Sequence, residues 1–254
     1  MGRVIAVANQ KGGVGKTTTA INLGAALAAL DRRVLIVDLD PQANATSGLG
    51  FTKGADRPNI YDLLIGDAGL GAARPTAFPN LSLVPSSRDL VGAEIELVER
   101  PDREQRLRMA LGPLRAGFDY VFVDSPPSLS LLTVNALTGA DSVLVPIQTE
   151  YFALEGLSEL LETVERVRRS FNPLLKVEGI VLTMYDDRTN LARQVTEDIR
   201  RHLGGLVYES VIPRNVRLGE APSHGQPVLA YDIKSRGAEA YLDLGREFLK
   251  RAPR

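Results

Sequence analysis

Two lysines flank a glycine-rich run near the beginning of the chain, and the residue types in this run suit the binding of phosphate groups. The run comprises Lys11, Gly12, Gly13, Val14, Gly15, Lys16, Thr17 and Thr18. Glycines let backbone N–H groups approach phosphates without a clash from Cβ, Lys16 adds a mobile positive charge, and Thr17 offers a hydroxyl to Mg²⁺. The alternative is an ordinary glycine-rich turn with a solvated lysine. The spacing favours a site for a nucleoside triphosphate.

The segments on either side of this run are those that a phosphate-binding loop requires. Residues 4–8 form a short apolar run typical of a strand, and residues 20–30 are apolar and alanine-rich, which indicates a helix. That helix would direct the positive end of its dipole at the phosphates. The predicted strand, loop and helix therefore support the same interpretation.

Three carboxylates follow two other predicted strands and complete the chemistry. Asp38 and Asp40 come at the end of the second apolar run, where alternation along an extended segment places them on the same side. Asp124 follows the apolar run 120–123 in the Walker B arrangement, in which a carboxylate holds Mg²⁺ while the metal bridges phosphate oxygens. Helix capping or turn chemistry is the alternative for all three. With the glycine-rich run, these residues predict hydrolysis of a nucleoside triphosphate by an activated water.

The glycine-rich run departs from the usual phosphate-loop pattern at its first position. That pattern has a glycine five residues before Gly15, where this chain has Gln10, followed by Lys11. The resulting KGGVGKTT sequence resembles the deviant Walker A motif of the ParA and MinD class of ATPases. The resemblance implies that Lys11 contacts the nucleotide of a partner subunit, that Asp40 orients or activates the attacking water, and that Asp38 lies near the Mg²⁺ shell. The expected catalytic residues are Lys11, Lys16 and Asp40, and the expected metal-binding residues are Thr17, Asp38 and Asp124.

Apolar runs typical of strands recur along the chain between helix-like stretches. They span residues 4–8, 34–37, 81–84, 120–123, 143–147, 180–184 and 207–212, whereas 72–79 and 222–227 are expected to be loops. Such runs, alternating with amphipathic segments, favour an α/β fold of three layers: a mostly parallel twisted sheet with helices on both faces, here of the P-loop type. The clearest helix spans residues 152–171, whose leucines and valines at three- and four-residue spacing we assign to the core.

The composition allows one large domain and excludes several classes of protein. The 254 residues, 44% of them hydrophobic, suffice for one core, and we expect a single domain over residues 1–254. The 30 Lys plus Arg nearly balance the 31 Asp plus Glu, so any nucleic-acid or membrane surface must be local. The absence of cysteine excludes the iron–sulfur cluster of nitrogenase iron proteins, which use the same fold. No apolar run reaches membrane-spanning length, so we expect a cytoplasmic protein.

Further sequence blocks make the resemblance more specific. Those similar to the chromosomal ParA (Soj) branch are DPQANATSGL at 40–49, GAEIELV at 92–98, YFALEGL at 151–157, LTMYDDRTNL at 182–191, VIPRNVRLGEAPSHG at 211–225 and SRGAEAYLDL at 235–244. The resemblance implies a homodimer that forms with ATP and Mg²⁺, binds double-stranded DNA without sequence preference on the nucleoid, and is reset when a ParB-type partner stimulates slow hydrolysis. It also implies that Met184, Pro213 and Asn215 contact the base.

A local excess of positive charge is the independent sign of DNA binding. Residues 200–236 contain six Lys and Arg against three Asp and Glu. This excess suits contact with phosphates, and dimerisation would double it. A solvated protein face is the alternative. The expected DNA-binding residues are Arg188 and Arg217, which match positions implicated in the family, together with Lys234 and Arg236.

Three other functions remain open from the sequence. A MinD-like membrane ATPase shares the loop but needs an amphipathic C-terminal anchor, and one apolar helical face does end in Lys250 and Arg251. Its members are Ala238, Tyr241, Leu242, Gly245, Phe248 and Leu249. Packing of the last helix on the domain explains the same face. A metabolic ATPase, such as an amide-forming ligase, and a scaffold that binds nucleotide without turnover are the remaining alternatives.

Overall fold

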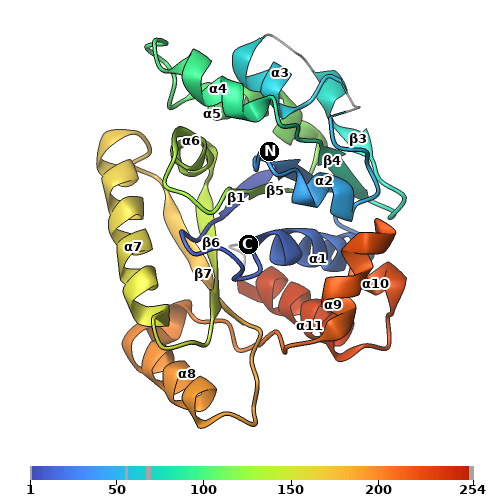
Figure 1. Ribbon diagram of the computed structural model, residues 1–254, viewed down its shortest axis with the longest axis vertical. Helices are drawn as coiled ribbons and strands as arrows, with labels where there is room; N and C mark the ends of the chain where they lie inside the picture. The colour runs from blue at the N-terminus through green and yellow to red at the C-terminus, as the bar shows by residue number, and fades with distance from the viewer. Residues whose placement is uncertain (1, 55–56, 67–69, 252–254) are drawn as a thin grey trace.

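The computed structural model describes residues 2–54, 57–66 and 70–251, which form a seven-stranded sheet between two layers of helices (Figure 1). The strand order is β3-β4-β2-β5-β1-β6-β7, and every pairing except β3 with β4 is parallel. The strands are β1 (Arg3–Val7), β2 (Val34–Asp38), β3 (Arg74–Pro75), β4 (Leu81–Val84), β5 (Tyr120–Asp124), β6 (Ser142–Gln148) and β7 (Lys176–Thr183). The predicted fold class is confirmed.

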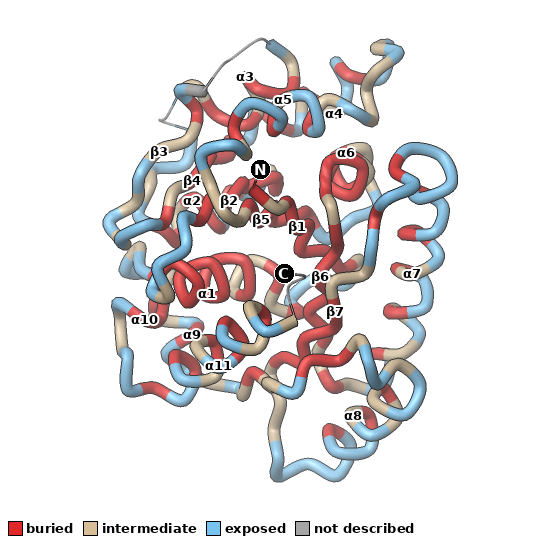
Figure 2. The backbone as a smooth tube through the Cα atoms, turned by 180° about the vertical axis from the view of Figure 1, so that it is seen from behind, coloured by how far each residue is buried: buried red, intermediate tan, exposed pale blue. Residues whose placement is uncertain are grey.

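The helices divide between the two faces of the sheet, and each face has its own apolar core. The helices are α1 (Lys16–Ala29), α2 (Asn44–Gly48), α3 (Ile60–Ile65), α4 (Leu90–Leu97), α5 (Arg106–Leu114), α6 (Leu131–Gly139), α7 (Ala153–Ser170), α8 (Asn190–Leu203), α9 (Val216–Glu220), α10 (Val228–Tyr231) and α11 (Arg236–Arg251). Residues of α1, α2 and α9 to α11 share a core on one face, and residues of α3 to α8 share a core on the other. Burial is concentrated in the strands and in α1 (Figure 2). A parallel sheet covered in this way explains why the central strands β1, β2, β5 and β6 are largely apolar.

Two segments differ from the sequence-based expectation. Residues 207–212, predicted as a strand, meet β7 only at isolated points. The backbone N–H groups of Tyr208 and Ile212 donate to β7. Those of Glu209 and Ser210 donate instead to the Glu247 carboxylate. The strand prediction was therefore wrong. An apolar segment that covers the edge of a sheet has the same composition as a strand, so the pattern did not distinguish the two. The expected loop at 72–79 contains the short antiparallel strand β3.

The predicted helix at 152–171 is α7, and its core assignment is largely confirmed. Leu157, Leu160, Val164 and Val167 are buried. Leu154 and Leu161 are half-buried and pack against the same core. The three- and four-residue spacing therefore identified the buried face of this helix.

The apolar face of α11 packs on the domain. Phe248 is fully buried against the rings of Tyr120 and Phe122, with centroids 5.4 and 5.9 Å away, and the buried Tyr241 hydroxyl lies 3.1 Å from that of Thr19 in α1. Core packing, one of the two explanations offered for this face, therefore accounts for it. Separately, none of the helices in the described ranges is both long enough and apolar enough to cross a bilayer.

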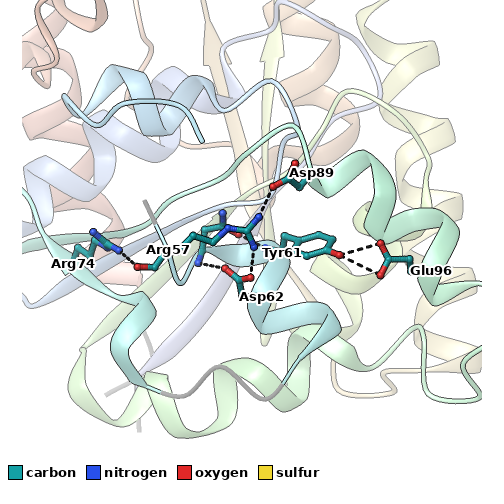
Figure 3. A network of polar contacts seen from close by, with 7 residues as sticks. Arg57, Tyr61, Asp62, Arg74, Asp89 and Glu96 are labelled. Atoms are coloured by element: carbon teal, nitrogen blue, oxygen red, sulfur yellow. Dashed lines mark hydrogen bonds and ion pairs between the residues drawn. The ribbon is translucent and has the colours of Figure 1, made fainter. Parts of the chain in front are cut away.

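A polar network fixes α3 against α4 beyond the end of β4 (Figure 3). Asn59 and Asp62 form a capping box at the start of α3. Arg57 forms ion pairs with Asp62 and with Asp89, which precedes α4, and the Tyr61 hydroxyl donates to the Glu96 carboxylate at 3.0 Å. The segment between β4 and α4 is thereby held at one end.

We expect Phe248→Ala to lower the free energy of unfolding by about 3 to 5 kcal/mol, because it removes a fully buried aromatic ring. Chemical denaturation monitored by circular dichroism measures this change. Lys250→Ala, on the exposed face of the same helix, is the matched control and should change stability by less than about 0.5 kcal/mol. Equal stability of wild type and Phe248→Ala would show that α11 does not contribute to the core.

Candidate nucleotide site

The glycine-rich run lies between β1 and α1, at the carboxyl edge of the sheet. Gly13 and Gly15 have φ values of 75° and 88°, in the left-handed region that favours glycine, and Gly15 directly precedes α1. No side chain caps the N-terminus of α1 at Gly15. The loop conformation and the first turn of α1 together suit the binding of an anion.

The two lysines of this run occupy different environments. Lys16 is 7% exposed and its Nζ donates to the backbone carbonyl of Lys11 at 3.0 Å. Burial lowers the pKa of Lys16, and the nearby Asp124 and Asp40 oppose that shift. By contrast, the Lys11 side chain is 45% exposed and pairs with the equally exposed Glu150 at 2.6 Å. Lys16 thus faces the interior of the site and Lys11 lies at the surface.

Asp124 ends β5 and is fully buried. Neither of its oxygens has a well-formed hydrogen bond within residues 2–54, 57–66 and 70–251. Burial and the neighbouring Asp38 raise the pKa of Asp124 well above its usual range, while the nearby Thr17 hydroxyl lowers it. A buried carboxylate beside a hydroxyl, at the phosphate loop, fits Mg²⁺, which takes one or two carboxylates and completes its shell with phosphates and water.

Asp38 and Asp40 lie beside Asp124, since Asp38 and Asp124 are paired in the register of β2 and β5. Asp38 is fully buried, and burial is the main cause that raises its pKa to about 6. It accepts hydrogen bonds from the Asp40 N–H and from both the N–H and the hydroxyl of Thr46. Asp40 is 6% exposed, and its Oδ1 accepts from the Gln42 N–H at 2.9 Å. The turn and capping roles considered from the sequence are therefore present at Asp38 and Asp40.

A cavity of about 220 Å³ lies on the other side of the loop and contains the three residues expected to contact a base. Met184, Pro213 and Asn215 line it together with Gly15 and Thr18 of the loop. The residues not anticipated from the sequence are Thr183, Ile212, Arg214, Leu218, Gly219 and Tyr241. Thr183 could have been anticipated, because it lies at the carboxyl end of β7, where ligands of a parallel sheet bind. Its hydroxyl donates to the Val14 carbonyl at 2.8 Å.

The four expected DNA-binding residues are exposed on adjoining segments near the start of α11. Arg188 and Arg236 line one wide groove of about 930 Å³. Arg217 in α9 contacts Asp232, two residues before Lys234, at 3.2 Å. The structure therefore brings the candidates onto one side of the domain.

Two of these arginines are already paired with carboxylates. Arg188 pairs with Asp186 at 2.7 Å and lowers the pKa of that carboxyl to about 2. Arg217 pairs with Glu220 at 2.7 Å, in addition to its contact with Asp232, and lowers the pKa of Glu220. A nucleic acid would have to compete with these carboxylates, which the sequence did not indicate.

Known proteins resemble this chain over nearly its whole length. A family model described as an AAA domain matches residues 2–177. The chromosome partitioning protein ParA of Myxococcus xanthus is 55% identical over 252 residues, which cover 99% of this chain and 89% of that protein. The sporulation initiation inhibitor protein Soj of Bacillus subtilis is 55% identical over 248 residues, 97% of this chain and 98% of that protein. The chain belongs to the ParA/Soj family.

The ParA/Soj assignment confirms the resemblance seen in the sequence blocks and agrees with the structural comparison. A solved structure of cobyrinic acid a,c-diamide synthase from Mycobacterium smegmatis, with bound ADP and magnesium, is 40% identical with a TM-score of 0.84. The match covers 98% of this chain and 95% of that one. The fold of this ParA/Soj protein thus also occurs in a protein named for metabolic chemistry.

The burial of Asp38 predicts a pH dependence of stability in this ParA/Soj protein without nucleotide or Mg²⁺. Because the pKa of Asp38 is about 6 in the folded chain, above its usual value, the folded state binds this proton more tightly than the unfolded chain. Acidification from pH 7 to pH 5 should therefore stabilise the wild type over Asp38→Asn by about 1 kcal/mol. Urea denaturation of both proteins across this range measures the difference, and parallel pH profiles would contradict the assignment.

Proposed function

We propose that the protein is an ATP-dependent dimerising switch that binds double-stranded DNA without sequence preference and acts in chromosome partitioning. The observation that carries this proposal is the division between the two loop lysines, one buried at the phosphate site and one exposed outside it. Relatives named ParA and Soj support the partitioning role. A ParB-type partner would stimulate hydrolysis, and the protein would act in the cytoplasm on the nucleoid.

ATP would bind across the loop, with its phosphates at the N-terminus of α1 and its base in the adjoining cavity. Lys16 and the backbone N–H groups of Gly13 to Thr18 would hold the phosphates, and Met184, Pro213 and Asn215 would contact the base. Thr17 and Asp124 would hold Mg²⁺, which neutralises phosphate charge. The orphaned oxygens of Asp124 are what this metal would satisfy.

Hydrolysis would depend on Asp40. Among the described residues the Asp40 carboxylate accepts one hydrogen bond, from the Gln42 N–H to Oδ1, which leaves Oδ2 available to orient a water. No covalent enzyme intermediate is needed. Slow turnover is expected until the partner protein completes or rigidifies the site.

Dimerisation would bring Lys11 to the partner subunit's nucleotide. In the single subunit Lys11 is held by Glu150, but an exposed ion pair of this kind contributes only about 0 to 1 kcal/mol. The triphosphate on the partner subunit therefore competes easily with Glu150. Each nucleotide would then be enclosed by two chains, and DNA-binding surfaces of both subunits would act together.

Replacement of Gly12 tests the dimer without disturbing the subunit. Among the described residues, a Cβ at Gly12 would have one neighbour within 4 Å, the Pro127 Cβ at 3.9 Å, so the fold tolerates a side chain here. We expect Gly12→Val to bind ATP within about twofold of wild type but to remain monomeric, because the valine crowds the facing subunit. Sedimentation velocity with Mg-ATP measures this, and a Gly12→Val dimer as stable as that of wild type would refute the proposed interface.

Arg217→Ala tests the DNA surface. If Arg217 contacts a phosphate, its loss should weaken DNA binding for all sequences and reduce the slope of log affinity against log salt by about 1. Arg246→Ala is the matched control, since Arg246 is an exposed arginine of α11 that also pairs with a carboxylate, Asp243, but is not among the candidates. Unchanged affinity and salt slope in Arg217→Ala would remove this residue from the DNA surface.

A metabolic ATPase is the second candidate, because the structural neighbour from Mycobacterium smegmatis is named as an amide-forming synthase. Binding of random-sequence duplex DNA, measured with ATP, with ADP and without nucleotide across a salt series, separates the two. DNA binding that requires ATP and weakens with salt supports the switch. Absence of DNA binding in every nucleotide state would favour the metabolic function.

A further inference from the structure

Four buried residues form a closed hydrogen-bonded circuit at the carboxyl ends of β2 and β4. The Asp38 carboxylate accepts from the Thr46 hydroxyl at 2.6 Å and from the Thr46 N–H at 2.7 Å. The Thr46 hydroxyl oxygen in turn accepts from the Ser86 N–H at 2.8 Å. The Ser86 hydroxyl donates to the Asp40 carbonyl at 2.8 Å, and the Asp40 N–H donates back to Asp38 at 3.2 Å.

All four residues of the circuit are shielded from solvent. Asp38 and Thr46 are fully buried, Ser86 is 1% exposed and Asp40 is 6% exposed. In such surroundings a hydrogen bond to an ionised group is stronger than one in water, and a missing partner is costly. The four residues therefore constrain one another's positions.

The segment that the circuit holds has an unfavourable backbone conformation. Ala43, between Asp40 and Thr46, has φ 52° and ψ 45°, in the left-handed region that a residue with a Cβ rarely adopts. The Ala43 N–H nevertheless donates to the Asp40 carbonyl at 2.9 Å, the same oxygen that accepts from Ser86. A segment under such strain keeps its shape only when its surroundings hold it.

Ser86 is also linked to α3, through the residue that precedes it. The neighbouring Pro85 carbonyl accepts from the Ile60 N–H of α3 at 3.0 Å. The Arg57 network of Figure 3 links Asp62 of α3 to Asp89, which directly precedes α4. Thr46 and Ser86 therefore connect the Asp40 segment to a rigid support.

We propose that Thr46 and Ser86 are positioning residues that fix Asp40 for hydrolysis, with Asp38 as their anchor. The inference rests on the proposed role of Asp40 in orienting water. Asp38 accepts three hydrogen bonds through both of its oxygens, whereas neither oxygen of Asp124 has a well-formed hydrogen bond within the described residues, so Asp38 is the carboxylate of this strand pair that the protein itself holds in place. A small displacement of a group that orients water costs a large factor in rate while leaving nucleotide binding intact.

Variants of the two hydroxyl residues test the inference. We expect Thr46→Val, which keeps the shape but loses the hydroxyl, to reduce the single-turnover hydrolysis rate by about tenfold or more, with ATP affinity within about twofold of wild type. Thr46→Ser retains the hydroxyl and should restore the rate to within about threefold of wild type. Ser86→Ala should slow hydrolysis without a change in ATP affinity. Ser87→Ala is the matched control, since this adjacent buried hydroxyl has no hydrogen bond within the described ranges.

A double-mutant cycle with Asp40→Ala separates positioning from general structural damage. If Thr46 acts through Asp40, Thr46→Val should slow residual hydrolysis by less than about twofold in the Asp40→Ala background. An equal loss in both backgrounds would overturn the inference. Wild-type rates in Thr46→Val and Ser86→Ala, with slow hydrolysis in Asp40→Ala, would overturn it while leaving the proposed function intact. Full hydrolysis in Asp40→Ala would instead remove the proposed role of Asp40 itself.

Discussion

Three carboxyl groups are buried at the ends of two neighbouring strands, beside the buried ammonium of Lys16. Burial raises the pKa of Asp38 and Asp124 and lowers that of Lys16, because each charged form loses its hydration. Asp38 accepts three hydrogen bonds, whereas Asp124 accepts no well-formed hydrogen bond within the part of the chain that the structure describes. Lys16 and Asp124 lie close to each other at the phosphate loop, so Mg²⁺ and a triphosphate would complement these charges.

The difference between buried and exposed charged groups also suits the proposed nucleotide-dependent switch. The groups proposed to bind phosphate are held rigidly, since they lie at the ends of β1 and β5 and at the start of α1, all of which are largely buried. The groups proposed to act between subunits are exposed and weakly held, as the Lys11 pair with Glu150 and the Arg217 pairs with Glu220 and Asp232 illustrate. A nucleotide held by the rigid groups can therefore replace a partner in one of these weak ion pairs at a small cost in free energy.

Sequence patterns predicted those features that depend on local order along the chain. The glycine-rich loop, the carboxylates at strand ends and the buried face of α7 each follow from spacing and from the geometry of a parallel sheet. Contacts between distant segments could not be predicted in this way. The Glu247 carboxylate of α11 accepts hydrogen bonds from the backbone N–H groups of Glu209 and Ser210, which prevents the expected strand at 207–212. The link from Thr46 to Ser86 joins residues 40 positions apart, and no periodicity records it.

Mixing two defective variants tests most directly whether each nucleotide site is completed by a second subunit. A Lys11→Ala subunit keeps its own Asp40, and an Asp40→Ala subunit keeps its own Lys11. If Lys11 acts on the partner's nucleotide, each variant alone should be inactive, while an equimolar mixture should hydrolyse ATP at about a quarter of the wild-type rate, because half of the dimers are mixed and each mixed dimer has one complete site. A mixture no more active than the separate variants would contradict the account.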